Sequence, residues 1–263
     1  MNNTNLFLIL GNQLFKPSLY LSGYRHCDVL LCEDFGLCSY YKHHKFKILL
    51  TLSAMRSYKD ELTSGGFNVI YKGIEEKDFY ESYISKLKKI IKKNKYKRLI
   101  FFEIEDKVFE KEVKALEEII EIQIVQSPMF LFSREEFSNF LKNNRPFMGN
   151  FYKLSRIKNK ILVKENRPLG GKWSFDHENR KKLPKNIVIP KTTFPKTTKH
   201  TKYLIPIVNK IFQNNIGQLE NFWLPTDRNS TLLFFEEFLK NKFDFFGDYE
   251  DALSNSNDFI FHS

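Results

Sequence analysis

Two residue periods alternate along the first 130 residues, and no other feature of the sequence limits the fold as strongly. Short apolar runs with β-type residues are typical of buried strands, and they recur at residues 5–11, 28–33, 67–72, 98–104 and 122–125. Apolar residues at helical spacing lie between them, over residues 45–62, 78–93 and 107–120, and Gly65-Gly66 ends the first of these segments. Strands that alternate with helices form a parallel sheet covered on both faces. The sequence therefore predicts a Rossmann-like, doubly wound α/β fold with five parallel strands.

Polar residues follow the first two predicted strands directly. Gly11-Asn12-Gln13 comes after the first strand, and Cys32-Glu33 ends the second. Ligands of doubly wound sheets bind at the carboxyl ends of the strands, beside the point where the strand order reverses. The chain has no GxGxxG or GxxxxGK[ST] motif, which argues against a pyrophosphate ligand. A crevice of this kind favours a planar heteroaromatic ligand, although Asn12 and Gln13 can equally serve only to form a turn.

The pattern changes after Pro128. Helical spacing is found at residues 134–142, 149–163, 203–214 and 230–243. Pro168, Gly170 and Gly171 break the chain, and residues 184–202 contain three prolines and no acid, which is typical of an extended linker. We expect an α/β domain at residues 1–133, basic helices and a linker at 134–202, and the first helices of an all-α domain at 203–263.

Positive charge is concentrated in the middle of the chain. Residues 134–210 carry 19 lysines and arginines against 5 acids, a net charge of +14, whereas the whole chain sums to +11. Such a belt predicts contact with DNA phosphates, and the alternative is a solvated linker. The candidate DNA-binding residues are Lys153, Arg156, Lys158, Lys160, Lys164, Lys172, Arg180, Lys181 and Lys182. Helical spacing would place the first five on a helix. Arg180 can instead pair with Asp176 or Glu178.

Several classes of protein and site are not supported by the sequence. The chain has a polar start and no run of 18 apolar residues, so we expect a cytoplasmic protein with no membrane partner. Its three cysteines, Cys27, Cys32 and Cys38, fit neither a disulfide framework nor a zinc ribbon. His43 and His44 are adjacent and would point about 100° apart on a helix, so they do not suit one metal ion. We expect no metal site and no hydrolase chemistry.

Eight runs resemble one family in order along nearly the whole chain. They are LILGNQL (8–14), LLCE (30–33), YYKHHKFK (40–47), SAMRSYKDEL (53–62), SPMFLFSREEF (127–137), FMGNFYKLSR (147–156), RPLGGKWSFDHENR (167–180) and FFGDYEDALSNSNDFIFHS (245–263). They are similar to the deoxyribodipyrimidine photolyase-related proteins, the bacterial iron–sulfur branch of the cryptochrome and photolyase superfamily. The run PLGGKWSFDHENR is the most specific of them.

The resemblance implies an N-terminal α/β domain for an antenna chromophore, 6,7-dimethyl-8-ribityllumazine, and a helical domain for FAD and a 4Fe-4S cluster. It also implies light-dependent repair of pyrimidine photoproducts in DNA, especially the (6-4) kind. The antenna-site residues carried over from the family are Gly11, Asn12, Gln13, Cys32, Glu33, Thr51 and Met55. The chain departs from the family, which has Asp at the position of Asn12, an acid near Leu37 and an aliphatic residue near Thr51. Loss of acids removes hydrogen-bond acceptors for the chromophore.

In this family the FAD-binding residues and the cluster cysteines follow a His-Ser pair, which here is His262-Ser263. The resemblance therefore implies that this chain corresponds to the N-terminal half of a family member and is inactive alone. Either a separate C-terminal photolyase half supplies the flavin, or the chain is a non-catalytic chromophore-binding or DNA-binding module, such as part of a blue-light sensor. Flavin absorbance and a photorepair assay would discriminate between these alternatives.

Overall fold

The computed structural model describes residues 3–255, 257 and 259–262. It contains two compact units: Met1–Met129 with Phe194–Leu232, and Phe130–Thr193 with Leu233–Ser263. The chain thus leaves the first unit and later returns to it. These units differ in extent from the predicted domains 1–133, 134–202 and 203–263, whose boundaries stay a prediction.

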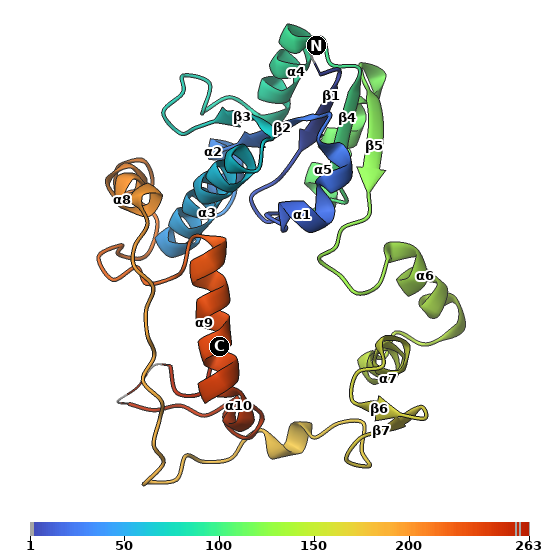
Figure 1. Ribbon diagram of the computed structural model, residues 1–263, viewed down its shortest axis with the longest axis vertical. Helices are drawn as coiled ribbons and strands as arrows, with labels where there is room; N and C mark the ends of the chain where they lie inside the picture. The colour runs from blue at the N-terminus through green and yellow to red at the C-terminus, as the bar shows by residue number, and fades with distance from the viewer. Residues whose placement is uncertain (1–2, 256, 258, 263) are drawn as a thin grey trace. The chain divides into compact units, whose positions relative to one another are not determined.

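The first unit contains a five-stranded parallel sheet in the order β3-β2-β1-β4-β5 (Figure 1). Its strands are β1 (Asn5–Leu8), β2 (Asp28–Cys32), β3 (Asn68–Lys72), β4 (Arg98–Phe102) and β5 (Glu121–Val125). All four pairings are parallel, and Phe7 of β1 lies opposite Val29 of β2 and Ile100 of β4. The predicted doubly wound α/β class is confirmed, and the strand order reverses between β1 and β4.

Alternate side chains of the strands enter two separate cores. Phe7, Val29 and Ile100 pack with helix α3 (Lys45–Ser64) on one face. Leu6, Leu30 and Leu99 pack on the other face with α4 (Tyr83–Asn94) and α5 (Lys107–Lys114). Figure 1 shows these helices on opposite sides of the sheet. The three inner strands, β1, β2 and β4, are buried on both faces, which is why they are nearly continuous apolar runs, whereas the edge strands β3 and β5 are partly exposed.

Local capping sets the helix bounds. α3 begins after His44, whose Nδ1 accepts a hydrogen bond from the Phe46 amide, and it ends at Gly65 as predicted. α4 begins later than predicted, because the hydroxyl of Ser82 accepts from the Ser85 amide and caps the helix there. Two short helices, α1 (Pro17–Tyr20) and α2 (Phe35–Ser39), and two 3-10 turns, Ser22–Tyr24 and Ala115–Glu118, complete the connections.

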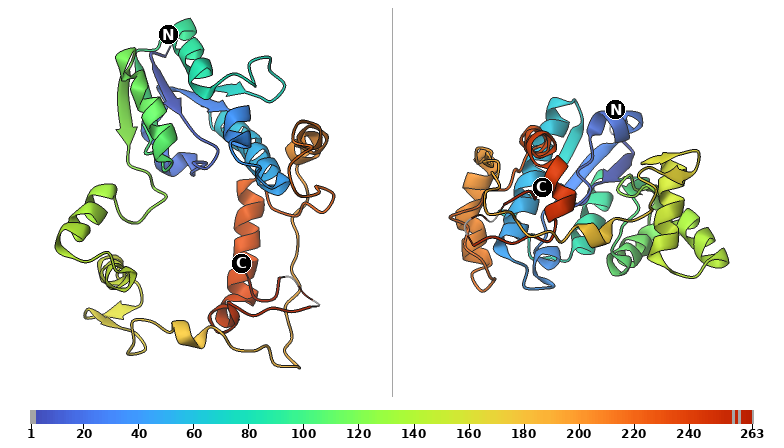
Figure 2. Two further views of the ribbon diagram at one scale, coloured as in Figure 1. Left: turned by 180° about the vertical axis from the view of Figure 1, so that it is seen from behind. Right: turned by 90° about the horizontal axis from the view of Figure 1, so that it is seen from below.

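The returning segment of the first unit contains helix α8 (Lys199–Ile211), which packs against α3 (Figures 1 and 2). Leu204 and Val208 of α8 are fully buried in the same core as α3. The helix predicted at 203–214 thus begins four residues earlier, at Lys199, because Thr198 caps α8 by accepting from the Thr201 amide. No helix in the described part of the chain is both long and apolar enough to cross a membrane.

The second unit consists of short elements. These are α6 (Arg134–Asn143), α7 (Met148–Asn159), a hairpin of β6 (Val163–Lys164) and β7 (Arg167–Pro168), a 3-10 turn (Asp176–Glu178) and α10 (Phe243–Tyr249). Helix α9 (Arg228–Asn241) enters this unit from the first. The predicted helix at 149–163 is wrong at its end. Lys160 has φ 54°, a left-handed conformation that stops α7, so Lys160 and Lys164 do not lie on the helix.

Candidate functional site at the carboxyl ends of the strands

A crevice of about 290 Å³ lies at the carboxyl ends of β1, β2 and β4. Its walls include Leu10-Gly11-Asn12 after β1, Cys32-Glu33-Asp34 at the end of β2, and Ile104-Glu105-Asp106 after β4. The first half of α3 forms the opposite wall, through residues such as Thr51 and Met55. The crevice therefore lies where the strand order reverses, which is the expected ligand position for a doubly wound sheet.

Six of the seven predicted antenna-site residues line this one crevice. They are Gly11, Asn12, Cys32, Glu33, Thr51 and Met55. The glycine is needed for close approach, because a Cβ at Gly11 would lie 2.7 Å from Thr51 Cγ2 and 2.9 Å from Met55 Sδ. Gln13 is the exception. Its side chain is fully buried, and its Nε2 donates to the carbonyl of Glu103 at 2.8 Å.

Glu33 has a buried carboxylate whose acceptor positions are already filled. Oε1 accepts from Arg56 Nε at 2.7 Å and from the Tyr71 hydroxyl at 2.5 Å. Oε2 accepts from Arg56 Nη2 at 3.0 Å and from the Ile74 amide at 2.6 Å. Burial, and next the Glu33 carboxylate, raise the pKa of Tyr71, so its hydroxyl remains a donor. Four donors fill the four acceptor positions of a carboxylate, so this geometry does not support Glu33 as a ligand contact.

Asp34 is a second buried acid, at the point where β2 meets the crevice. Its Oδ2 lies 2.5 Å from Lys86 Nζ of α4, and the two side chains are 2% and 1% exposed. Its Oδ1 accepts from the Leu37 amide at 2.8 Å and caps α2. The pair neutralises the charge of Asp34 inside the apolar core between the sheet and α4.

Acceptors that the sequence reasoning missed come from the segment after β4. Glu105 Oε2 accepts from Asn12 Nδ2 at 3.2 Å, and Oε1 accepts from the Ser127 hydroxyl at 3.0 Å. Both Glu105 and Asp106 line the crevice. The sequence contains a signal for them, because Glu105 and Asp106 directly follow the fourth predicted strand, which ends at residue 104. Glu105 thus places a carboxylate beside Asn12, which is hydrogen-bonded to it.

Aromatic rings gather at the rim of the crevice. Tyr40 and His43 both line it, and their ring centroids are 5.0 Å apart. Burial, and next the charge of Lys47, lower the pKa of His43, so its ring is neutral at pH 7 and available for stacking. Tyr83 and Phe109 add aromatic faces inside. The crevice therefore combines flat apolar surfaces with a few hydrogen-bonding groups, as small-molecule sites do.

The cysteine thiols are not activated for metal binding or for nucleophilic attack. Burial raises the pKa of Cys27 to about 11 and of Cys32 to about 12, so both stay protonated at neutral pH. Cys38 is also a free thiol, and burial raises its pKa to about 12. Over residues 3–255, 257 and 259–262, no three His, Cys, Asp or Glu side chains are placed to hold a metal ion.

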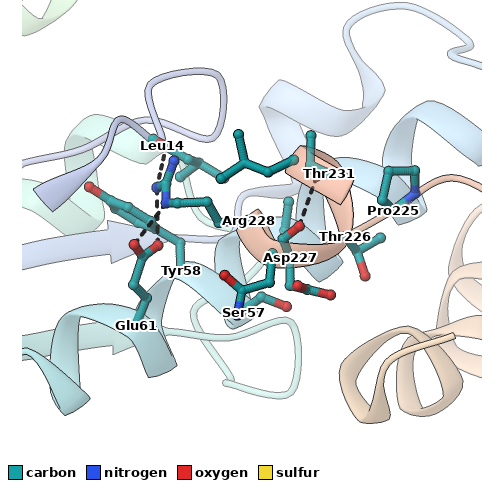
Figure 3. Close-up of a pocket in the computed structure, with 12 residues that line it drawn as sticks. Leu14, Ser57, Tyr58, Glu61, Pro225, Thr226, Asp227, Arg228 and Thr231 are labelled. Carbon is teal, nitrogen blue, oxygen red and sulfur yellow. Dashed lines mark hydrogen bonds and ion pairs between the residues drawn. The ribbon is translucent and has the colours of Figure 1, made fainter. Parts of the chain in front are cut away.

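A second cavity, of about 400 Å³, lies between α3 and residues 225–232 (Figure 3). Figure 3 shows Arg228 reaching Glu61, and its Nε and Nη2 donate to the two oxygens of that carboxylate at 2.8 and 3.0 Å. Arg228 Nη2 also donates to the carbonyl of Leu14, and the Tyr58 hydroxyl donates to the carbonyl of Phe15. These polar groups are already paired, so this cavity offers less than the crevice for orienting a polar ligand.

Of the nine predicted DNA-binding residues, five are held by partners within the chain and four are exposed without an ion pair among the described residues. Arg156 is 6% exposed, and its guanidinium donates to the carbonyls of Ile161, Leu162 and Trp173. Four more belong to ion pairs, which are Lys158–Glu136, Lys172–Glu178, Arg180–Asp251 and Lys181–Asp248. The four that remain exposed, with no ion pair among the described residues, are Lys153, Lys160, Lys164 and Lys182. Arg180 pairs with Asp251 rather than with Asp176 or Glu178.

Comparison with known proteins decides the family. The family model of the "Deoxyribodipyrimidine photo-lyase-related protein" matches residues 7–224. The chain belongs to this family. It is 32% identical over 269 aligned positions to a protein named (6-4) photolyase from Agrobacterium fabrum, which covers 99% of this chain and 52% of that protein. It is 27% identical to the uncharacterized protein R852 of Acanthamoeba polyphaga mimivirus, over 70% of this chain and 98% of R852.

The photolyase-related chain thus spans about half the length of the (6-4) photolyase that it matches. The family implies flavin-type cofactors in general. No cluster of ligands for an iron–sulfur centre is found in the described part of the chain, whose three thiols are protonated. Of the pair predicted to begin the flavin site, His262 is described and Ser263 lies outside the described residues.

Proposed function

We propose that the crevice of this photolyase-related chain binds a planar, light-absorbing heteroaromatic molecule of the 6,7-dimethyl-8-ribityllumazine type. One observation carries the proposal: six residues carried over from the family's antenna site line a single crevice at the reversal point of the sheet. When bound, such a chromophore supplies light absorption. The residues of the chain bind and orient it and exclude water.

The residues present fit such a ligand. The crevice volume of about 290 Å³ is close to the lower end of the usual range for small-molecule sites. Tyr83, Phe109 and the rim aromatics supply flat surfaces for a ring system. Asn12 and Glu105 supply a donor and an acceptor at the mouth, and they suit ring N–H groups and ribityl hydroxyls. The apolar floor around Leu10, Ile104 and Met55 excludes water from the ring.

Reconstitution with the lumazine tests the proposal. We expect the purified chain to bind it and to retain its absorbance band through gel filtration. Gly11→Val fills the crevice, since even a Cβ there meets Thr51 and Met55, and it is expected to weaken binding at least about tenfold. Gly23→Val is the matched control, because a Cβ at Gly23 has no atom within 4 Å. Absence of binding by the unaltered chain, or equal binding by both variants, would contradict the proposal.

Light-dependent repair of pyrimidine photoproducts in DNA is the activity we propose for the complete assembly to which this chain contributes. The relative named (6-4) photolyase supports it. No group of His, Cys, Asp or Glu side chains among the described residues is placed to hold a 4Fe-4S cluster, and no step of the reaction is assigned to the described chain. Co-expression with a C-terminal photolyase half, followed by a flavin absorbance scan and a photorepair assay, tests this activity. A chain that gives no repair in that setting is a non-catalytic module or sensor part.

DNA contact is the second candidate function, and the exposed lysines of the second unit favour it. Lys153, Lys164 and Lys182 are exposed and carry no ion pair among the described residues. Cations of this kind displace counterions from phosphates, so the affinity for DNA should fall steeply with salt.

Two charge-matched variants test whether the basic belt at residues 134–210 binds DNA. The triple variant Lys153→Ala, Lys164→Ala, Lys182→Ala removes three positive charges from the second unit. The control variant Lys88→Ala, Lys92→Ala, Lys93→Ala removes three exposed charges from α4 in the first unit. We expect the belt variant to lower the log–log salt slope of duplex binding by roughly 3, at about 0.9 per contact, and the control to leave it unchanged. Equal effects of the two variants would contradict a specific DNA surface at the belt.

A further inference from the structure

One wall of the crevice is built from the stretch between β2 and α3. Helix α2 and the turn that follows it contribute Leu37, Cys38, Tyr40 and His43 to the crevice. This stretch is not part of the sheet, and α2 is only five residues long, too short to be stable by its own hydrogen bonds. Something else in the fold must hold the wall in place.

The residues that hold it come from far along the chain, at residues 212–222 after α8. Asn215 Nδ2 donates to the carbonyl of His43 at 2.8 Å, and the Lys45 amide donates to the carbonyl of Ile216 at 2.9 Å. These two bonds fix both ends of the short stretch between the crevice rim and the start of α3. They lie about 170 residues away in sequence from the residues they bind, within the same compact unit.

Aromatic packing supports the same wall. Phe212 stacks on Phe35, the first residue of α2, with ring centroids 5.9 Å apart and an interplanar angle of 16°. Phe222 meets Phe46 edge-on at 5.1 Å. Such ring pairs contribute about 0.5–1.5 kcal/mol each beyond the area they bury. The returning segment therefore contacts the wall at its beginning, at α2, and at its end, at the first turn of α3.

Gly217 makes this contact possible at its tightest point. Its φ is +97°, and a Cβ placed on it would lie 2.3 Å from Cε1 and Nε2 of the His44 ring. The ring cannot turn away without loss, because its Nδ1 accepts from the Phe46 amide at 3.1 Å and caps α3. Even a methyl group at Gly217 would therefore push His44 out of the cap and move the adjacent rim residue His43.

We infer that residues 212–222 are a structural part of the crevice, and that Asn215 and Gly217 are positioning residues for its outer wall. Neither residue lines the crevice itself. They fix His43, His44 and α2, which together shape the mouth. The effect on ligand affinity rests on the function proposed above, whereas the effect on the wall does not. A piece of the chain that contained only the sheet and its helices would have a loose crevice.

Hydrogen exchange and lumazine titration of the full chain test this inference together. Gly217→Ala and Asn215→Ala are expected to speed amide exchange across residues 35–48 at least about tenfold, and to raise the lumazine Kd by a similar factor. Gly66→Ala is the matched control for the glycine: its φ is +80°, so alanine is equally strained there, but the nearest atom to its Cβ is at 3.6 Å. Asn214→Ala is the control for Asn215, because Asn214 is exposed.

The possible outcomes distinguish the inference that residues 212–222 hold the wall from the proposal that the crevice binds lumazine. Faster exchange at the wall with weaker lumazine binding, in the two variants and not in their controls, supports the inference. Unchanged exchange at residues 35–48 overturns it, whether or not lumazine binds. Faster exchange with an unchanged Kd overturns the link to ligand binding and leaves the proposed function intact. If the unaltered chain binds no lumazine, the proposed function fails, and the exchange data alone decide whether these residues hold the wall.

Discussion

Replacing Lys86 by methionine removes the cation from a buried ion pair that adjoins the crevice. Lys86 Nζ lies 2.5 Å from Asp34 Oδ2, and it also donates to the carbonyls of Glu33 at 3.3 Å and Phe79 at 3.2 Å. The ammonium group thus has one ion-pair partner and two carbonyl acceptors. Methionine keeps most of the volume of the side chain in the core against the sheet, so the change is mainly electrostatic.

The expected cost follows from burial. Removing one member of a buried pair costs about 3–5 kcal/mol, because the other charge stays in the core without a partner. For a unit of this size that loss lowers the melting temperature by roughly 6–20 °C. Adding Asp34→Asn to Lys86→Met removes the orphaned charge, and asparagine can still accept the hydrogen bond from the Leu37 amide. We therefore expect the double variant to regain about 2 kcal/mol.

The assay must report on the first unit alone. The chain has two tryptophans, Trp223 in the first unit and Trp173 in the second. Urea unfolding followed by fluorescence in a Trp173→Phe background thus reads the stability of the unit that contains the pair. Lys88→Met, on the same helix and exposed, is the matched control and should change stability by less than about 0.5 kcal/mol. A loss below about 1 kcal/mol for Lys86→Met, or a double variant no more stable than the single one, would refute the reasoning.

Two further predictions concern Cys32 and Arg156. Burial raises the pKa of Cys32 from the ordinary 9.0 to about 12, so the thiol ionises at a lower pH in the unfolded chain than in the folded one. The contribution of the protonated thiol to the free energy of unfolding is therefore complete below pH 9 and declines as the pH rises from 9 toward 12. Urea titrations across that pH range should show a smaller loss of unfolding free energy for Cys32→Ala than for the unaltered chain. An identical loss in both would contradict the assignment of this pH dependence to Cys32. Arg156→Lys loses most of three hydrogen bonds to carbonyls and should destabilise the second unit by roughly 2–3 kcal/mol, read from Trp173 in a Trp223→Phe background. A salt slope of DNA binding that falls in this variant while its stability is unchanged would show that Arg156 contacts phosphate instead.

The sheet and the place of the crevice could be predicted because both depend on local periodicity. Each of the three inner strands is buried on two faces and is therefore an apolar run. Chain order and the reversal rule then place Gly11 and Cys32 at one edge of the sheet. Thr51 and Met55 could be added only by resemblance to the family, since periodicity alone does not say which turn of α3 faces the strand ends. Gln13 does not line the crevice, because the turn after β1 points its side chain inward to the carbonyl of Glu103.

The partners of the acids could not be predicted from the sequence. The acceptor positions of the Glu33 carboxylate are filled by Arg56, which lies 23 residues away, and by groups on and just after β3. The role of Glu33 therefore depends on how α3 and β3 pack. Glu105 accepts a hydrogen bond from Asn12, which lies 93 residues away in the sequence. The outer wall is a stronger case, since it depends on residues 212–222, which the sequence pattern assigns to a separate helical domain. Local patterns predict elements, but they carry no information on which distant polar groups meet when those elements pack.

The basic belt shows how this limits a functional argument drawn from charge alone. Its formal net charge of +14 counts only residues 134–210, whereas acids from other parts of the sequence can pair with these cations in the folded chain. Arg180 and Lys181 pair with Asp251 and Asp248, which come from the acidic end of the sequence, and Arg156 is buried against carbonyls. With four of the nine predicted contacts left unpaired, the salt slope attributable to them is about −4, whereas nine contacts would give about −8. If the pairs of Arg180 and Lys181 with Asp251 and Asp248 open when DNA binds, two more cations reach the phosphates and the slope becomes about −5. The measured slope therefore reports how many of the paired side chains leave their partners for DNA.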